Sequence, residues 1–284
     1  MNILVLGASG MIGRTMFRVL SQHPEWAVTG SIRANNFQTE SLQRVIVGSD
    51  LCNLEHIVRL FRRVRPKVVV NCAGLTKHVP EGGDPLAALT INSLLPHRLA
   101  EQCAIAEARL IHISTDCVFS GSVGNYLETD LPDAVDVYGR TKALGEVFGD
   151  NIITLRTSTI GHEHATAHGL LEWFLSQEEK CKGFRHAIFS GLPSVEFARI
   201  VRDLVIPNLS LSGLYHVGGA PIDKLSLLRL IAEAYGKKIQ IEEQIDFRIN
   251  RSLSFDKFSK ATGYQAAAWP ELIGMMHQDY LSGK

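Results

Sequence analysis

The sequence predicts an α/β fold, in which a doubly wound parallel sheet is joined to a smaller C-terminal α/β domain. The first half of the chain alternates short β-rich runs with segments of helical period, and several of these runs are apolar on both faces. A glycine-rich turn directly follows the first run. Alternating strands and helices wind into a parallel sheet through right-handed crossovers, which places a ligand crevice at the carboxyl ends of the strands.

The first half is expected to contain six strands and four helical stretches. The strands are the short apolar runs at residues 2–7, 26–32, 43–48, 67–74, 108–114 and 151–156. The helical stretches lie between them, at residues 11–23, 54–64, 85–108 and 138–149. Together these segments predict a first domain with the bounds 1–157.

The rhythm of strands and helices loosens after Arg156. Helical periodicity marks residues 169–177, 194–206, 224–236 and 270–281, and short strands are expected at 213–218 and 238–243. The sequence has no internal repeat and no low-complexity linker. Residues 158–284 are therefore expected to form mainly a second domain, with some elements packing back on the first.

Composition narrows the class of protein. The chain has 284 residues and a formal net charge of zero, so it has no overall attraction to nucleic acid or to an anionic membrane. The apolar N-terminal run lacks a basic leader and breaks at glycines, and no segment is long enough to span a bilayer. Five scattered cysteines without a C-x-x-C pair are typical of reduced thiols. We expect a cytoplasmic protein.

Gly7, Gly10 and Gly13 stand in the segment LGASGMIGR, after the first strand and at the start of the first helix. The first glycine permits a tight turn, the second lets a pyrophosphate approach the backbone, and the third lets helix and strand pack closely. The helix N-terminus adds free N–H donors and the positive end of a dipole. These features predict a dinucleotide site of the Rossmann type, whose turn residues also include Ser9, Met11 and Ile12.

The ends of the next strands bear on the choice of cofactor. An acid after the second strand would bind the ribose 2′-hydroxyl of NAD, whereas an arginine pairs with the 2′-phosphate of NADP. The segment TGSIRANN has no acid and supplies Arg33, which favours NADP; a solvated surface arginine is the alternative. Asp50 either accepts from the adenine amino group, with Leu51 over the ring, or caps the following helix. Ala73 and Gly74 are small enough for a ribose to lie against the backbone.

Two polar clusters point to chemistry at a carbonyl group. Ser114 and Thr115 end the fifth strand, at the mouth of the sheet. Tyr138 and Lys142 follow in VYGRTKALGE, and their spacing stacks both side chains on one helix face. Thr115 and Tyr138 can then bond one carbonyl oxygen, with Tyr138 as the proton donor, while Lys142 lowers its pKa and bonds the nicotinamide ribose. Tyr280 begins a second pair of this spacing near the chain end, where no chemistry is expected.

The segments GASGMIG, DLCN, NCAGLT, STDCVFSG and VYGRTKALGE resemble the extended short-chain dehydrogenase/reductase superfamily, and most of all its dTDP-4-dehydrorhamnose reductase branch. The resemblance covers residues 1–160 well and is thinner afterwards, in GLYHVGG and RSLSFDKF. It implies a catalytic triad of Thr115, Tyr138 and Lys142. It also implies a structural water held by Asn92. The implied cofactor is NADP(H), with NAD(H) as the alternative, in a site lined by Gly7 to Gly13, Asp50, Leu51, Ala73, Gly74 and Thr76.

The resemblance implies NADPH-dependent reduction of the 4-keto group of a nucleotide-activated 6-deoxy sugar, a step toward surface polysaccharide precursors. A nucleotide-sugar epimerase or dehydratase is one alternative, and Asp116 beside Thr115 keeps the dehydratase open. A binding-only regulatory subunit, like that of methionine adenosyltransferase, is the other. The chain departs from the branch at Cys117, where the family has an aromatic residue, and in the loops that would face the sugar. The nucleotide and the sugar therefore stay open.

Polar residues of the later loops bear on the substrate and on metal binding. Arginine, lysine and histidine side chains can bind a diphosphate. Together with Asp116, five such residues are the predicted substrate contacts: Lys77, His78, Arg156, His162 and Arg185. His164 and His168 have the spacing of a zinc pair, but no third ligand is tied to them, so no metal site is predicted.

The sequence also bears on assembly. The helical stretch 85–108 and the helix of Tyr138 are expected to be neighbours on one side of the sheet. Members of the superfamily often dimerise through this pair, and the stretch carries enough apolar residues to cover an interface as well as the sheet. We expect a homodimer, although a monomer with an ordinary buried helix would have the same pattern.

Overall fold

A seven-stranded sheet forms the centre of the protein, as seen in a computed structural model that describes residues 1–33, 44–76, 84–163 and 169–282. Its strand order is β10-β6-β5-β4-β1-β2-β3, and all neighbouring strands are parallel. The strands are β1 (Asn2–Leu6), β2 (Ala27–Ile32), β3 (Val45–Val47), β4 (Val68–Asn71), β5 (Arg109–Thr115), β6 (Ile152–Thr157) and β10 (Gly213–His216). The predicted α/β class with a parallel sheet is confirmed.

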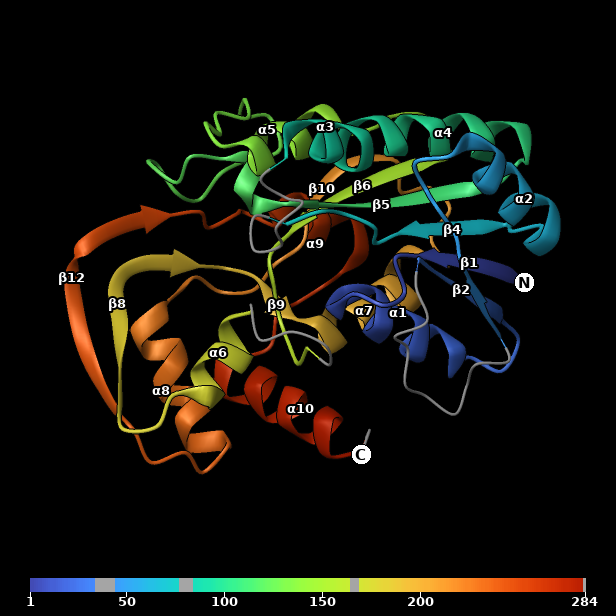
Figure 1. Ribbon diagram of the computed structural model, residues 1–284. Helices are drawn as coiled ribbons and strands as arrows, with labels where there is room; N and C mark the ends of the chain where they lie inside the picture. The colour runs from blue at the N-terminus through green and yellow to red at the C-terminus, as the bar shows by residue number, and fades with distance from the viewer. Residues whose placement is uncertain (34–43, 77–83, 164–168, 283–284) are drawn as a thin grey trace.

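Helices cover both faces of this sheet (Figure 1). One face carries α2 (Leu54–Val64), α3 (Pro85–Ala88), α4 (Leu95–Ile105) and α5 (Val137–Leu144), and the other carries α1 (Met11–Ser21) and α7 (Ser194–Ile200). The two faces explain why the strands are apolar throughout. In β1, Ile3 belongs to the same buried cluster as Met16 of α1, whereas Leu4 belongs to a cluster with Ile57 of α2.

The predicted helix 85–108 is divided into three segments. The Asp84 side chain caps α3 by accepting from the Leu86 N–H, and Pro85 occupies the first turn. A π-helical stretch, η3 (Leu89–Leu94), then separates α3 from α4. The predicted helix 194–206 is similarly divided into α7 and a π-helical stretch, η5 (Val201–Val205). Such wide turns are often found at functional sites, and η3 contains the buried Asn92.

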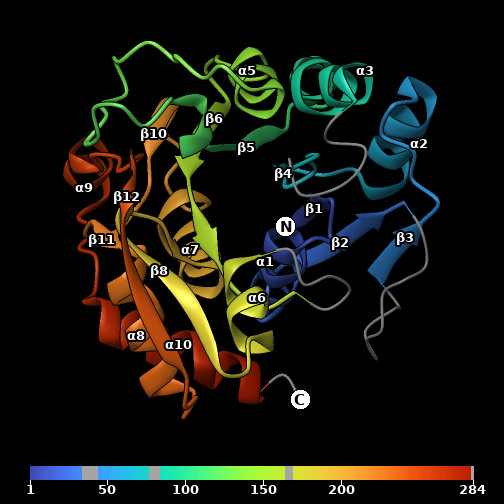
Figure 2. The ribbon, with the colours of Figure 1, turned by 60° about the vertical axis from the view of Figure 1, so that its left-hand side comes forward.

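The second half of the chain builds a smaller sheet beside the first (Figures 1 and 2). Its order is β11-β8-β12, and a separate two-stranded sheet joins β7 to β9. The elements are β7 (Thr159–Ile160), α6 (Leu170–Ser176), β8 (Lys180–Phe189), β9 (Leu192–Pro193), β11 (Ile222–Asp223), α8 (Lys224–Ala234), β12 (Gln240–Asn250), α9 (Asp256–Thr262) and α10 (Trp269–Ser282). Strand β8 was not expected from the sequence, because its segment mixes charged, small and aromatic residues.

The two halves of the chain are interleaved in space. Strand β10 lies beyond residue 157, yet it pairs with β6 at the edge of the large sheet, with Gly213 opposite Ile153. The domain bounds 1–157 and 158–284 stay a prediction. No helix within the described residues has both the length and the apolar character needed to cross a membrane.

Candidate active site

The glycine-rich turn after β1 is tightly packed. Gly7 has a φ of 72°, and a Cβ atom there would lie 2.8 Å from the Ala73 backbone. A Cβ on Gly13 would lie 2.1 Å from the Gly7 carbonyl oxygen, so helix α1 packs against the turn only because this position is glycine. Gly10 is the N-cap of α1 and has no side chain to bond the first-turn N–H groups. These groups are open to an anionic ligand.

The ends of β2 and β3 lie close together. Asn53, not Asp50, caps α2, because its side chain accepts from the Glu55 N–H. The capping alternative for Asp50 is therefore wrong; its exposed carboxylate accepts from the Cys52 N–H at 3.0 Å. Burial and Asp50 raise the pKa of the Cys52 thiol, and Arg33 lowers it, so Arg33 and Asp50 act on one thiol. This placement fits a site for the adenosine of NADP, whose ribose carries a 2′-phosphate. The roles of Arg33 and Asp50 in that site stay predictions.

The turn after β4 is fastened by Asn92. Asn92 Oδ1 accepts from the Leu75 N–H and Nδ2 donates to the Leu75 carbonyl oxygen, both at 2.9 Å. The same Nδ2 lies 3.2 Å from Thr141 Oγ1 on α5. The amide thus holds the turn that contains Ala73 and Gly74 against the helix of Tyr138 and Lys142, and the implied water stays a prediction. Thr76 is exposed beyond the turn.

Thr115 and Tyr138 meet at the carboxyl end of β5. Burial raises the pKa of Tyr138, with a contribution from Cys117, while a hydrogen bond with the Thr115 side chain lowers it. The net direction is upward, so the prediction of a lowered pKa for Tyr138 is wrong for this structure. Thr115 Oγ1 also accepts from the Cys117 N–H at 3.1 Å, which fixes its side chain at the start of the following turn.

Lys142 lies one helical turn from Tyr138 and is 5% exposed. Its Nζ donates to the Ile113 carbonyl oxygen at 2.6 Å. Burial lowers the pKa of Lys142 to about 8, although Glu146 and Cys72 act in the opposite direction. The ammonium therefore stays largely charged at neutral pH.

Asp116 is buried next to Thr115, which donates to its Oδ1 at 3.2 Å. Burial raises the pKa of Asp116, and the nearby Arg251 lowers it. Arg251 donates from Nε to the Phe119 carbonyl oxygen at 2.8 Å and from Nη1 to Cys117 Sγ at 3.5 Å. Sequence reasoning assigned no role to Arg251. The segment RSLSFDKF that contains it was the available signal.

Arg156 does not fit the predicted diphosphate contact. Its guanidinium donates to both carboxylate oxygens of Glu146 at 2.7 Å, and the two side chains are 3% and 4% exposed. A cation buried in this way cannot present its charge to a ligand, so this prediction is corrected. Arg185 lies on β8 of the smaller sheet and pairs with Glu243 of β12. Lys77, His78, His164 and His168 lie outside the described residues.

His162 belongs to an aromatic cluster rather than to the group around Tyr138. Its Nδ1 lies 2.6 Å from Glu172 Oε1 and its Nε2 lies 2.8 Å from the Tyr235 hydroxyl. Its ring stacks on Tyr280 with centroids 3.8 Å apart. Tyr280 is thus held by packing in α10. The predicted substrate contact of His162 remains untested.

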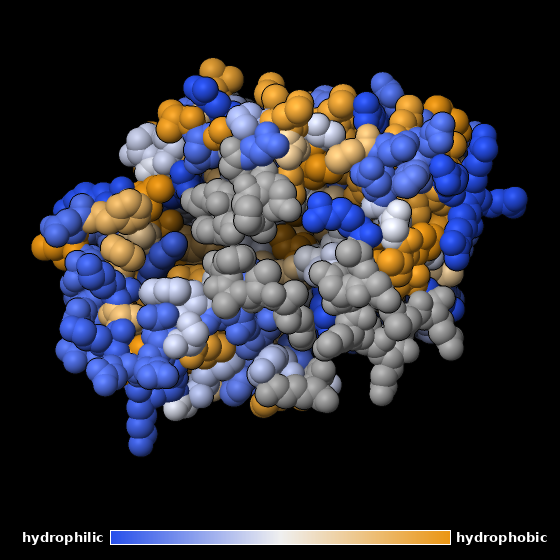
Figure 3. All heavy atoms as spheres, viewed as in Figure 1, coloured by the Kyte–Doolittle hydropathy of each residue, from blue (hydrophilic) through white to orange (hydrophobic). Residues whose placement is uncertain are grey.

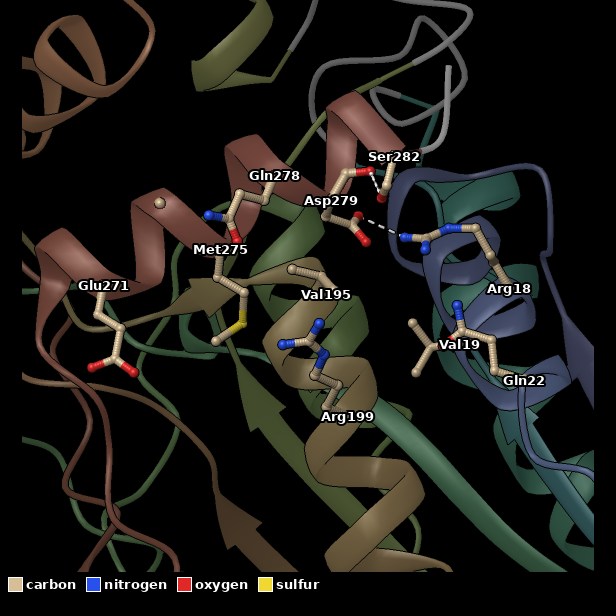
Figure 4. Close-up of a pocket in the computed structure, with 11 residues that line it drawn as sticks. Arg18, Val19, Gln22, Val195, Arg199, Glu271, Met275, Gln278, Asp279 and Ser282 are labelled. Carbon is tan, nitrogen blue, oxygen red and sulfur yellow. Dashed lines mark hydrogen bonds and ion pairs between the residues drawn. The ribbon is translucent and has the colours of Figure 1, made fainter.

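A separate groove of about 660 Å³ lies between α1, α7 and α10 (Figure 4). An ion pair between Arg18 and Asp279 spans one end of it at 2.6 Å. Its lining contains Arg199 and Glu271 but none of the predicted catalytic residues. Among the described residues, no cluster of three or more histidine, cysteine or carboxylate side chains is placed to hold a metal ion.

The parallel sheet, the glycine turn and the grouping of Thr115, Tyr138 and Lys142 define a chain of the extended short-chain dehydrogenase/reductase type. The family model described as the RmlD substrate binding domain matches residues 1–245. The chain therefore belongs to this family, and the resemblance seen in the sequence is confirmed.

The proteins with similar sequences include both a subunit of methionine adenosyltransferase and a reductase. The rat (Rattus norvegicus) methionine adenosyltransferase 2 subunit beta is 31% identical over 145 residues, which are 51% of this chain but 41% of that protein. The chain thus spans less than half the length of this curated relative. A dTDP-4-dehydrorhamnose reductase from Aggregatibacter actinomycetemcomitans is 25% identical over 230 residues, 78% of this chain and 74% of that protein.

The fold is also found among solved structures. The crystal structure of a dTDP-4-dehydrorhamnose reductase from Bacillus anthracis, in complex with NADP, superposes with a TM-score of 0.79. It is 18% identical, and the match covers 98% of each chain. At this identity the match shows a shared fold.

Proposed function

We propose that the protein reduces the 4-keto group of a nucleotide-activated 6-deoxy sugar with NADPH. The observation that carries this proposal is the placement of three residues: Thr115 ends β5, and Tyr138 and the buried Lys142 lie one turn apart on α5, which packs against that strand. Relatives named dTDP-4-dehydrorhamnose reductase support the substrate class. We place the activity in the cytoplasm, in the supply of surface polysaccharide precursors.

The cofactor fits the residues present. The turn leaves no room for a side chain at Gly7 or Gly13, and Gly10 opens the N-terminus of α1 to a pyrophosphate. Arg33 would meet the 2′-phosphate and Asp50 the adenine. When bound, NADPH supplies the hydride for the carbonyl carbon.

The residues around the carbonyl then have separate roles. Thr115 orients the oxygen of the substrate, and Tyr138 donates a proton to that oxygen as the carbonyl is reduced. The raised pKa of Tyr138 keeps its hydroxyl protonated until the oxygen becomes basic. Lys142, held by the Ile113 carbonyl, presents a positive charge to the ribose and the phenol.

The test is oxidation of NADPH in the presence of a panel of nucleoside-diphosphate 4-keto-6-deoxyhexoses. We expect turnover with at least one dTDP- or UDP-linked sugar, and little with free keto-sugars, because a diphosphate adds binding energy remote from the reacting carbon. If no sugar nucleotide gives either turnover or thermal stabilisation, the proposal fails.

A regulatory subunit is the second candidate, and the match to the rat methionine adenosyltransferase subunit favours it. A binding-only role needs the nucleotide site but not the proton donor. The variant Tyr138→Phe separates the two: a reductase loses turnover, whereas a regulatory subunit retains its effect on a partner enzyme. The intact set of Thr115, Tyr138 and Lys142 favours the reductase.

We also propose a homodimer formed through α3, η3 and α5. These elements contact one another and carry exposed apolar side chains, with Leu86 74%, Leu144 62% and Leu94 44% exposed. Figure 3 shows orange atoms along the upper edge of the molecule, where these helices lie. Light scattering should detect a dimer that Leu144→Glu dissociates. A species of only 31.3 kDa at micromolar concentration would contradict the proposal.

A further inference from the structure

A buried hydrogen-bond network meets β5 at Ser114, next to Ile113, whose carbonyl oxygen accepts the bond from Lys142. Ser114 Oγ donates to Glu146 Oε1 at 2.7 Å, and Arg156 donates to both oxygens of Glu146 at the same distance. The Glu146 carboxylate therefore accepts three hydrogen bonds in a place closed to water. Ser114 comes directly before Thr115, and Glu146 follows Lys142 by four residues, so the network touches both predicted catalytic segments.

The network extends from Arg156 into the second half of the chain. Arg156 Nη1 lies 3.3 Å from His216 Nε2, and His216 Nδ1 lies 3.1 Å from the Tyr126 carbonyl oxygen and 3.2 Å from that of Ser254. Burial and Arg156 lower the pKa of His216 to about 4. The imidazole is therefore neutral at physiological pH, so it accepts from Arg156 and donates through Nδ1. Arg156 is fixed from both sides and holds Glu146 in one orientation.

The charges that face Lys142 single out Glu146. The ammonium is influenced by Glu146, which lies just beyond the end of α5, and by Cys72 after β4, and it acts in turn on His112 of β5. Burial raises the pKa of Cys72 to about 12, so this thiol is neutral. Burial and Lys142 hold the pKa of His112 well below 6.5, so this imidazole is neutral as well. Among these facing groups, Glu146 supplies the negative charge.

We propose that Glu146 is a positioning residue, fixed by Ser114 and Arg156, that keeps Lys142 charged and directed at the mouth of the sheet. Burial by itself would favour the neutral amine, and a fixed carboxylate nearby opposes this. The importance of the arrangement for catalysis rests on the proposed function, because a charged Lys142 is what would bond the ribose and act on Tyr138.

The first test uses the unaltered protein. Labelling lysine with ¹³C at Cε allows Lys142 to be titrated by NMR, with its signal assigned from its loss in Lys142→Met. We expect a transition near pH 8, so that most molecules carry the charge at pH 7. A Lys142 that is neutral at pH 7 would overturn the proposal, and this measurement does not depend on the folding of any Glu146 variant.

The second test removes the charge of Glu146 and keeps its shape. In Glu146→Gln, checked for folding by circular dichroism, the transition of Lys142 should move down by about one pH unit or more. Glu101→Gln, an exposed glutamate of α4, is the matched control and should leave it in place. An unchanged transition in a folded Glu146→Gln would rule out the role of Glu146.

Activity adds a separate readout. In the reductase, kcat/KM should fall as the pH rises through the pKa of Lys142, and Glu146→Gln should move this alkaline limb to lower pH by the same amount. If Lys142 titrates as expected but no sugar nucleotide is reduced, the proposed function fails while the inference holds. If turnover is found without a shift of the limb or of the NMR transition, the inference alone fails.

Discussion

Asn92 and Leu75 are joined by two hydrogen bonds of opposite direction, each 2.9 Å long. The side-chain amide of a π-helical turn thus replaces the strand partner that the backbone of Leu75 lacks after β4. We expect Asn92→Ala to leave both backbone groups unpaired and to lower the free energy of unfolding by about 1–3 kcal/mol. Urea unfolding measures this, and NADPH titration should show weaker binding because the turn is loosened. Asn151→Ala, at an exposed asparagine, serves as the control. An equally small loss of unfolding free energy in both variants would contradict a stabilising role for the Asn92–Leu75 hydrogen bonds.

Tyr138→Phe should remove most turnover and leave NADPH binding nearly intact. The phenylalanine keeps the ring but has no proton to give, and loss of a general acid commonly costs about 10²–10⁴-fold in rate. Initial rates and fluorescence titration of NADPH measure the two effects separately. A variant with nearly unaltered kcat would show that the proton comes from another group.

Arg33→Ala should weaken NADPH much more than NADH. A guanidinium that meets the 2′-phosphate makes charge-assisted hydrogen bonds that NADH cannot form. Calorimetric titration of both cofactors against both proteins gives the comparison. Equal losses for the two cofactors would mean that Arg33 does not contact the 2′-phosphate.

Gly13→Ala and Gly274→Ala should have opposite effects on stability. A Cβ at Gly13 would lie 2.1 Å from the Gly7 carbonyl oxygen, so α1 or the turn must move. A Cβ at Gly274 in α10 meets no atom within 4 Å, and alanine favours the helix there by roughly 0.5–1 kcal/mol. We expect a lower Tm and impaired NADPH binding for Gly13→Ala, and an equal or higher Tm for Gly274→Ala. A Gly13→Ala protein of unaltered Tm and affinity would refute the close packing.

His216 should make stability depend on pH. Its pKa is about 4 in the folded protein, because of burial and Arg156, and about 6.5 in an unfolded chain. Below pH ~6.5 the unfolded state binds a proton that the folded state rejects, so this stabilising contribution is present above pH ~6.5 and is lost as the pH falls toward 4. Replacing His216 with asparagine should therefore reduce the loss of unfolding free energy between pH 7 and pH 4.5 by about 2 kcal/mol or more. Urea unfolding at both values tests this, and the same pH dependence in both proteins would contradict it.

Local pattern was enough to predict six of the seven strands of the large sheet, whereas the seventh, β10, was expected in the second half of the chain. Each of its first six strands is a short apolar run, and the glycine spacing after β1 marks the turn without knowledge of any distant contact. Strand β8 was missed because a strand with one solvated face need not form an apolar run. The π-helical stretch η3 was missed because one wider turn barely disturbs the helical period.

The candidate site divides in the same way. Thr115 and Tyr138 come from motifs, and the contact between them follows from the order of the strands. Arg156 was predicted to bind a diphosphate because it is a cation near the end of a strand. Its position in the sequence does not reveal that Glu146, ten residues earlier, pairs with it in the interior. The contact of Arg251 with Cys117 spans 134 residues, and no local pattern predicts such a pair.

The return of β10 to the large sheet has a consequence for synthesis on the ribosome. His216, which bonds Arg156, is made 60 residues after it. At roughly 5–20 residues per second, the edge of β6 waits about 3–12 seconds for its neighbouring strand. During this interval the nascent chain exposes the unpaired backbone of β6 and lacks the imidazole that completes the buried network. The N-terminal half is therefore expected to bind chaperones until the C-terminal half emerges. The two halves are expected to become stable together.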